Sequence, residues 1–308
     1  MWNFLNQGNA NILFSYLGDK PEFKDKAVRV SKIGRTDLES AVSFYNTLVS
    51  HFLGDEFRVD MEIIELDSIE LKELQREMSK YTECKLVSNR VLMMPNLLYD
   101  DAISLEIKPK WATRYSSSFK CRYCLHQIEK LKLGLIERKS LYCPLKLFSD
   151  DPKKTAEAID NLFNDPQNNL AIFQKGLPKD PKDFMHLKKD LVQILRDKVI
   201  EPLKHAQMLF DPFGVDCMSK TFQEYFKDDF NEREICTIPF SGKIEDREDA
   251  ERYLNSYLTA MALRDCSLFV IFRPSDTIVK IIDLDQKSFS KFPFYVQQHR
   301  NLMSNCTP

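Results

Sequence analysis

The chain has 308 residues, with 44 Lys and Arg against 46 Asp and Glu and a formal net charge of −2. This near-neutral balance excludes a general nucleic-acid binder, so any anion site has to be a local basic pocket. The length allows one large domain or two lobes, and a composition of 43% hydrophobic and 29% charged residues is typical of a globular protein with a core of its own.

Cysteine usage and hydrophobicity indicate the compartment of the protein. The eight cysteines are spaced irregularly, and the first residues, Met1 to Phe4, lack the basic and apolar stretches of a secretory signal. No window approaches the roughly 18 uncharged apolar residues of a membrane span. We therefore expect an intracellular protein with reduced thiols and no membrane-spanning segment.

The first part of the chain is predicted to be rich in strands. A glycine-containing turn at 6–11 belongs to a hairpin, and a capping box from Thr36 to Glu39 begins a helix. A second helix is expected at 68–81. Alternating and apolar stretches predict strands at 12–17, 26–30, 57–66 and 90–99.

The second part is predicted to be larger and richer in helices. Periodic stretches predict helices at 152–164, 183–208 and 248–263, and strands at 266–272 and 277–284. Pro95 interrupts the strand before this part, so we place the boundary between two lobes there, with residues 1–96 in the first and 97–308 in the second. The sequence thus predicts an α+β fold with a kinase-like outline, in which a strand-rich lobe precedes a larger, helix-rich lobe.

The stretch EIKPKW, which begins at Glu106, places charge on an apolar strand. Because alternate residues of a strand share a face, Glu106, Lys108 and Lys110 would point one way while Ile107 points into the core. Either an anionic ligand lies on the charged face, or the stretch is an edge strand protected by lysine and proline.

Two carboxylates are predicted to meet at the open end of the last hairpin. If the turn centres near Pro274, Asp265 and Asp283 are cross-strand partners with Cβ atoms roughly 4.5–5.5 Å apart. Such a pair favours a divalent metal bound to nucleotide phosphates, with Asp283 and Asp285 as candidate ligands and Asp265 as the residue that orients or deprotonates a hydroxyl. The alternative is that Asp265 ends a helix and Asp283 is an exposed strand end.

Lysines could complete an anion pocket near these carboxylates. Lys287 and Lys291 follow Asp283 at a spacing that shares one helical face. With Lys108 and Lys110 they would hold several phosphates as point charges. Alternatively, the later pair is a solvated helix face.

Paired asparagines form a further candidate site. The stretch DPQNN ends in Asn168 and Asn169, whose amides can donate to phosphate or hydroxyl oxygens, although asparagine is also common in turns.

Seven short stretches together resemble one enzyme family. NQGNAN, VRV, LEIKPKW, RYCLHQ, DPQNN, RDCS and IDLD occur across nearly the whole chain in the order of the inositol pentakisphosphate 2-kinases, and the compact length resembles the fungal form. The resemblance implies transfer of the γ-phosphate of ATP, with Mg²⁺, to the axial 2-hydroxyl of inositol 1,3,4,5,6-pentakisphosphate, which gives the hexakisphosphate (phytate).

The resemblance also implies a role for each matching residue. It assigns the catalytic base to Asp265 and the metal site to Asp283, with Asp285 as the second candidate. The residues that would hold ATP are Gly8, Asn9, Ala10, Asn11, Arg29 and Glu106. The residues that would hold the substrate phosphates are Arg35, Lys108, Lys110, Arg122, His126, Lys130, Asn168, Asn169, Lys287 and Lys291.

The chain departs from related kinases in two respects. Plant members of the family carry a structural zinc with Cys and His ligands, whereas Cys121-x-x-Cys124 lacks a partner pair at zinc spacing, so buried free thiols are favoured over zinc. The G-x-G-x-x-G, H-R-D and D-F-G signatures of protein kinases are missing, which disfavours protein substrates.

Partners and location follow from the same resemblance. It implies inositol pentakisphosphate as the partner, no direct nucleic-acid contact, and a nuclear role linked to messenger RNA export through the product. We expect a monomer. The alternative functions are a non-catalytic inositol polyphosphate sensor and a kinase for another inositol phosphate.

Overall fold

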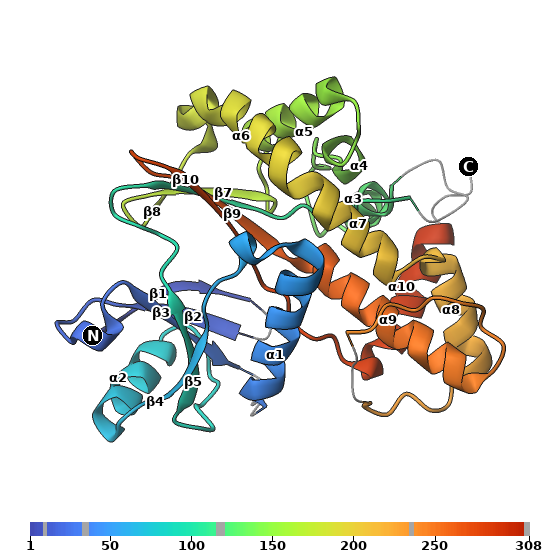
Figure 1. Cartoon of the computed structure of the whole chain (residues 1–308), viewed down its shortest axis with the longest axis horizontal. Coiled ribbons are helices and arrows are strands. Elements are labelled where there is room, and N and C mark those ends of the chain that lie inside the picture. Colours follow the sequence, from blue (N-terminus) through green and yellow to red (C-terminus); the bar gives the residue numbers. More distant parts are fainter. Residues whose placement is uncertain (9–10, 33–36, 115–120, 234–236, 305–308) are drawn as a thin grey trace.

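The computed structural model of the chain describes residues 1–8, 11–32, 37–114, 121–233 and 237–304. These residues form two antiparallel five-stranded sheets with helices around them (Figure 1). The predicted fold class, an α+β protein of two-lobed, kinase-like form, is confirmed.

The strands of the first sheet all precede residue 96. In spatial order they are β1 (Trp2–Gln7), β2 (Asn11–Tyr16), β3 (Lys26–Ser31), β5 (Arg90–Pro95) and β4 (Glu62–Glu65). The helix α2 (Ser68–Met78) covers one face, where its Leu74 and Met78 share a core with Phe14 of β2 and Val28 of β3. All four side chains are fully buried, so this sheet has an apolar core of its own.

The strands of the second sheet all follow residue 102. In spatial order they are β10 (Thr277–Ile282), β9 (Ser267–Phe272), β6 (Ile103–Ile107), β7 (Leu170–Gln174) and β8 (Leu177–Lys179). Strands from three distant parts of the sequence thus lie beside one another. The division of the chain into lobes at residue 96 stays a prediction.

Helices make up most of the remaining second part. They are α3 (Arg122–Lys132), α4 (Pro144–Leu147), α5 (Pro152–Asn164), α6 (Lys188–Ile194), α7 (Ile200–Phe210), α8 (Gly214–Tyr225), α9 (Arg247–Asp265) and α10 (Phe292–Ser304). The helix predicted at 183–208 is a longer helical run, because a 3₁₀ segment precedes α6 and a π-helical turn joins α6 to α7. In Figure 1, α8, α9 and α10 lie together at one end of the molecule.

The helix α1 (Leu38–Leu48) connects the two sheets. Figure 1 shows it between the first sheet and the helices of the second part. Its Phe44, Tyr45 and Leu48 are buried in the same core as residues of β6, β9 and β10. The hydroxyl of Tyr45 donates to the carbonyl of Ile281 at 2.9 Å and accepts the N–H of Val59 at 2.8 Å. The helix thus belongs to the core of the second sheet.

Two predictions about local structure need correction. Thr36, the predicted helix cap, lies outside the described residues, and α1 begins after Asp37, whose carboxylate accepts the N–H of Ser40 at 2.9 Å. The strand predicted at 57–66 is confined to β4, because Phe57 and Val59 are buried in the core that contains α1. The alternation of apolar residues at 57–66 therefore arose partly because Phe57 and Val59 pack into a core without belonging to a strand.

No helix within the described ranges is long and apolar enough to cross a bilayer.

We predict that Tyr45→Phe destabilises the protein. The change leaves the buried N–H of Val59 and carbonyl of Ile281 without this shared partner, which costs about 1–3 kcal/mol. Urea denaturation should show a lower midpoint with an unchanged slope. The matched control is Tyr81→Phe, at a 40% exposed side chain, which should leave the midpoint in place. Equal midpoints for the two variants would contradict the assigned role.

Candidate active site

The pairing of the second sheet brings four chain segments to one edge. Ile107, the last residue of β6, pairs with Leu170 at the start of β7 and with Leu268 near the start of β9. Ser267 of β9 in turn pairs with Ile282, the last residue of β10. Because the strands are antiparallel, the residues that follow β6 and β10 meet those that precede β7 and β9. About half of the predicted site residues lie in these four segments.

The stretch EIKPKW is only partly a strand. β6 ends at Ile107, and Lys108 adds one further bond by donating its N–H to the carbonyl of Asn169 at 3.0 Å. Lys110 has a φ of 64°, which no strand residue adopts. The prediction that Glu106, Lys108 and Lys110 share one strand face is therefore wrong. The edge-strand alternative is also wrong, because β6 is the central strand of its sheet.

Glu106 and Asp283 share one hydroxyl group. Ser267 Oγ lies 2.8 Å from Glu106 Oε1 and 3.2 Å from Asp283 Oδ2. Because a hydroxyl has one proton, it can donate to only one carboxylate at a time. Burial raises the pKa of Glu106, and the hydrogen bond from Ser267 and the charge of Lys108, whose Nζ lies 4.0 Å away, only partly offset this. The pair thus has more negative charge than its nearest donor can satisfy.

Asp265 lies between two lysines. It is the last residue of α9, and its carboxylate is 3.7 Å from Lys110 Nζ and 3.1 Å from Lys287 Nζ. Desolvation acts to raise the pKa of Asp265, but the positive charges of Lys287 and Lys110 outweigh it and lower the pKa. Burial lowers the pKa of Lys110, and the charge of Asp265 opposes this. The three groups therefore form an ion cluster with two ammonium groups for one carboxylate.

The predicted cross-strand pair of Asp265 and Asp283 is wrong. The register of β9 and β10 pairs Phe272 with Thr277, which is one residue away from the expected register, and Asp265 belongs to a helix. Of the alternative, the part that Asp265 ends a helix is confirmed, whereas the part that Asp283 is exposed is wrong. Asp283 follows β10 as a half-buried residue with a φ of 61°. Its carboxylate reaches the site through Ser267 instead.

The lysines after β10 do not share a helical face. Lys287 lies in a stretch without helix or strand, while Lys291 ends the short 3₁₀ helix η6 (Phe289–Lys291) and is exposed. The prediction that both project from one helix is therefore wrong. Only Lys287 contacts Asp265.

Asp285 is bound by residues of the first sheet. Both oxygens of its carboxylate accept from Arg29 Nη2, and Oδ2 also accepts from Asn11 Nδ2 at 3.2 Å. Burial acts to lower the pKa of Arg29, but the charge of Asp285 outweighs it, so the guanidinium pKa is raised. This contact connects β2 and β3 to the segment after β10, and it places two predicted ATP-binding residues beside a predicted metal ligand.

Besides the lysines around Asp265, a second group of basic residues lies on α3. Arg122, His126 and Lys130 recur every fourth residue and therefore share one face of the helix. Arg122 Nη1 lies 3.3 Å from His299 Nδ1, while its Nε is buried and has no hydrogen-bond partner within the described part of the chain. Burial, followed by the charges of Arg122 and Lys130, lowers the pKa of His126 to about 3. His126 is therefore neutral near pH 7, and Arg122 retains a free donor.

The paired asparagines have different environments. Asn169 is buried, and its amide donates to the hydroxyl of Tyr123 on α3, so it connects the sheet edge to the second basic group. Asn168 is exposed beside it.

The glycine-containing turn is described only in part. The N–H of Gly8 donates to the carbonyl of Asn11 at 2.9 Å, and a Cβ added at Gly8 would meet nothing within 4 Å. Asn9, Ala10 and Arg35 lie outside the described residues. The ligand-binding roles of all the predicted residues stay predictions.

Sequence reasoning missed a buried ion pair behind the site. Arg264, next to Asp265, donates to Asp211 Oδ2 at 2.7 Å, and their side chains are 1% and 0% exposed. The guanidinium carbon of Arg264 lies 3.9 Å from the ring centroid of Trp111, and that of Arg122 lies 5.1 Å from it. This arrangement fixes the end of α9 and links the two basic groups. Asp211 gives no sequence signal, because its partner is far away along the chain.

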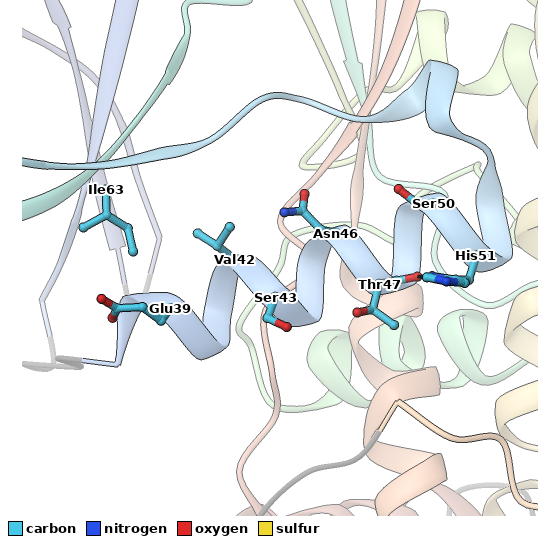
Figure 2. A pocket seen from close by; sticks show the side chains of 8 residues that line it. All are labelled: Glu39, Val42, Ser43, Asn46, Thr47, Ser50, His51 and Ile63. Atoms are coloured by element: carbon cyan, nitrogen blue, oxygen red, sulfur yellow. Dashed lines mark hydrogen bonds between the residues drawn. The ribbon is translucent and has the colours of Figure 1, made fainter.

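A groove outside this site runs along α1. It has a volume of about 500 Å³ and is lined by Glu39, Val42, Ser43, Asn46, Thr47, Ser50, His51 and Ile63 (Figure 2). None of the predicted site residues lines it. Figure 2 shows mostly hydroxyl and amide groups along the helix, and no lysine or arginine is among the lining residues.

The fold and this site together define a class of protein. A strand-rich part and a helix-rich part meet at a cluster of carboxylates and lysines, which is the arrangement of a two-lobed, kinase-like protein. A family model described as inositol-pentakisphosphate 2-kinase matches residues 4–301. The chain therefore belongs to the inositol-pentakisphosphate 2-kinase family, and the resemblance seen in its sequence is confirmed.

Individual relatives agree with the family match. The chain is 28% identical to the inositol-pentakisphosphate 2-kinase of Arabidopsis thaliana over 57% of its own length and 52% of the plant protein. It is 23% identical to the protein of that name from Cryptococcus neoformans over 93% of the chain and 88% of the relative, and 22% identical to that from Yarrowia lipolytica over 94% and 86%. The chain spans about half the length of the plant relative and most of the length of the fungal ones.

We predict that Lys287→Met and Lys110→Met each raise the pKa of Asp265. Removing an ammonium group lets desolvation dominate, since it already acts to raise this pKa. Carbon-13 NMR titration of the aspartate carboxyl groups measures the shift. Lys291→Met is the matched control and should leave the pKa unchanged. An unchanged pKa in Lys287→Met would contradict the ion cluster.

The stability of the protein should follow the same titration. Because the folded pKa of Asp265 is lowered, its contribution is present above the unfolded value of about 3.9 and is lost as the pH falls below it. In Lys287→Met this part of the acid dependence should be smaller.

Proposed function

We propose that the chain is an ATP-dependent kinase that phosphorylates the 2-hydroxyl of inositol 1,3,4,5,6-pentakisphosphate to give inositol hexakisphosphate. The observation that carries the proposal is the position of Asp265 between Lys110 and Lys287, at the sheet edge where Glu106 and Asp283 also lie. Family membership supports the choice of donor and acceptor. The proposal concerns a chain that spans about half of its plant relative.

The substrate phosphates would be held by the lysines of the sheet edge and the basic face of α3. Five phosphates on one ring demand a concentrated positive charge, and ammonium groups act as point charges toward phosphate. Lys108, Lys110 and Lys287 lie in segments that meet at the edge. Arg122 supports this assignment through its buried, unpartnered Nε, which is a donor that a phosphate oxygen can satisfy.

Asp265 would receive the proton of the attacking hydroxyl. The 2-oxygen forms a bond to the γ-phosphorus of ATP, the bond from that phosphorus to the bridging oxygen breaks, and ADP leaves. Lys110 and Lys287 hold Asp265 as a weakly basic carboxylate. Substrate phosphates compete for the same ammonium groups, so binding weakens their effect on Asp265 and raises its basicity. The base would thus be strengthened when the acceptor is present.

Mg²⁺ is the cation that the carboxylates of the edge fit. Glu106 and Asp283 supply the hard oxygen ligands it prefers, and Ser267 has only one proton for both. Asp283 would hold the ion, and Asp285 would join it only by sharing its contact with Arg29. When bound with ATP, Mg²⁺ neutralises charge on the phosphates.

ATP would lie between the first sheet and the edge of the second. Gly8, Asn11 and Arg29 would contact it from the first sheet, and Glu106 from β6. The proximity of Asn11 and Arg29 to the segment after β10 supports this placement. Asn9 and Ala10 belong to the same turn in the sequence.

Location and assembly are proposed from the family resemblance. We infer a nuclear protein whose product links it to messenger RNA export, and a monomer without direct nucleic-acid contact. The formal net charge of −2 supports the last point.

The first test is turnover in the wild type and in Asp265→Ala. Each protein is incubated with ATP, Mg²⁺ and a panel of inositol phosphates, and phosphorus NMR identifies the products. We expect the wild type to convert the pentakisphosphate to the hexakisphosphate. Asp265→Ala should lose at least about 10²-fold in kcat and retain its affinity for the pentakisphosphate in calorimetry. A wild type that binds the compound without turnover would favour the sensor function, and full kcat in the variant would exclude Asp265 as the base.

A second prediction concerns Lys108. Lys108→Ala removes one phosphate contact made before and during reaction, so KM for the pentakisphosphate should rise about tenfold with kcat little changed. Steady-state kinetics measures both constants. Lys153→Ala, at an exposed position on α5, is the control. A loss confined to kcat would contradict a binding role.

A further inference from the structure

Two residues with no role in the proposed function lie next to Arg122 in a row of polar contacts. The helix α10 packs against both α3 and α8. His299 of α10 meets Arg122 of α3, where Arg122 Nη1 lies 3.3 Å from His299 Nδ1. It also meets Asp216 of α8, whose Oδ1 lies 2.8 Å from His299 Nε2. The ring of His299 therefore joins a carboxylate on one helix to a guanidinium on another.

The carboxylate of Asp216 determines which nitrogen of His299 carries the proton. Because a carboxylate accepts hydrogen bonds, Nε2 is the protonated nitrogen of the neutral ring. Nδ1 then has a lone pair and accepts from Arg122 Nη1. Burial, followed by the charge of Arg122, lowers the pKa of His299, and Asp216 opposes this. The ring is therefore neutral near pH 7, as this order of donors and acceptors requires.

The contacts with α10 hold Arg122 by its terminal nitrogens. Nη2 donates to Gln298 Oε1 at 3.3 Å, while Nη1 donates to His299. The guanidinium carbon lies 5.1 Å from the ring centroid of Trp111. Nε is buried and has no hydrogen-bond partner among the residues that the structure describes. The orientation of the guanidinium is thus fixed while a donor for a phosphate oxygen stays open.

The start of α3 positions the backbone of Arg122 but not its side chain. Cys121 precedes the helix, and its sulfur accepts the N–H of Cys124 at 3.2 Å. Cys143 Sγ lies 3.6 Å from Cys121 Sγ, a neighbour that the sequence did not indicate. Beyond its Cα, an arginine side chain has several rotatable bonds, and ordering them when a ligand binds costs entropy. Contacts that order the side chain beforehand therefore raise affinity.

We propose that Asp216 and His299 are positioning residues, which orient Arg122 for a phosphate group of the inositol pentakisphosphate. Asp216 acts through the tautomer of His299, and His299 acts through the guanidinium of Arg122. The inference rests on the proposed function, because it takes Arg122 as a phosphate-binding residue. The competing role is a clamp between α8 and α10, which would stabilise the fold without affecting the substrate.

The tautomer of His299 can be measured independently of activity. Nitrogen-15 NMR of the wild type with labelled histidine distinguishes a protonated nitrogen from one with a lone pair, and the His299→Asn spectrum assigns the signals. Near pH 7 we expect a proton on Nε2 and a lone pair on Nδ1, with and without the pentakisphosphate. The opposite tautomer, or a ring protonated on both nitrogens, would overturn the proposal.

Affinity then separates positioning from stability. Calorimetry with inositol 1,3,4,5,6-pentakisphosphate should give a Kd about tenfold higher in Asp216→Ala and in His299→Leu, with kcat little changed, because Arg122 loses its fixed orientation. His299→Asn keeps an acceptor in place of Nδ1 and should stay within about threefold of the wild type. Asp228→Ala, at an exposed position after α8, is the matched control. Wild-type affinity in Asp216→Ala with a lower melting temperature would favour the clamp and overturn the proposal.

A double-mutant cycle tests whether Asp216 acts through Arg122. In an Arg122→Ala background, Asp216→Ala should cause no further loss of affinity, whereas losses that add would contradict the proposal. If Arg122→Ala fails to fold, Arg122→Lys is the background, since it lacks the guanidinium fork that His299 contacts. A wild type that neither binds nor converts the pentakisphosphate would overturn the proposed function, and this inference with it, even where the tautomer is as expected.

Discussion

The site depends on the hydrogen-bond register of β6 in the middle of the second sheet. Antiparallel pairing on both sides of this strand makes the end of β6 coincide with the start of β7 and the start of β9. A shift of one residue would turn each side chain of β6 to the opposite face. Glu106 would then leave Ser267, and Ile107 would leave the core. The apolar residues of β6 thus determine where the charged residues beyond its end are placed.

The electrostatics of the edge are concentrated and unbalanced. The chain is nearly neutral overall, but at this edge two lysines contact one aspartate while two carboxylates share one hydroxyl. Lys110 and Asp283 also have positive φ angles, which are costly for residues other than glycine by roughly 1–2 kcal/mol. Such costs persist when the surrounding structure fixes the backbone, as the hydrogen bond from Gln207 Nε2 to the carbonyl of Lys110 does at 2.9 Å. Unbalanced charge and strained backbone at this edge are typical of a site that binds ions.

The sequence predicted helices and strands better than it predicted contacts between residues that are distant along the chain. The fold class and α5 followed directly from periodicity, because a periodic apolar face reports its own secondary structure. The pairing of Asp265 with Asp283 failed because the sequence did not locate the centre of the hairpin turn to one residue, and because α9 continues to Asp265. The prediction that Lys287 lies on a helical face failed because β10 is followed by a stretch without regular secondary structure.

Other parts of the site could not be predicted at all. Ser267 lies between two carboxylates only because of the strand register, and Asp211 meets Arg264 only through the packing of α7 against α9. Cys143 is a single residue that no spacing rule connects to the Cys-x-x-Cys pair. Contacts between distant residues depend on the tertiary structure, which a single sequence does not display.

Because α1 belongs to the first part of the sequence but packs in the core of the second sheet, the two lobes are not independent folding units. A fragment that began after residue 96 would keep the whole second sheet but lose Phe44, Tyr45 and Leu48 from its core. Each such side chain stabilises the fold by about 1.5–3 kcal/mol when buried. The complementary fragment would expose the same apolar face to water. Neither half is therefore expected to be a stable protein by itself, although each contains a complete sheet.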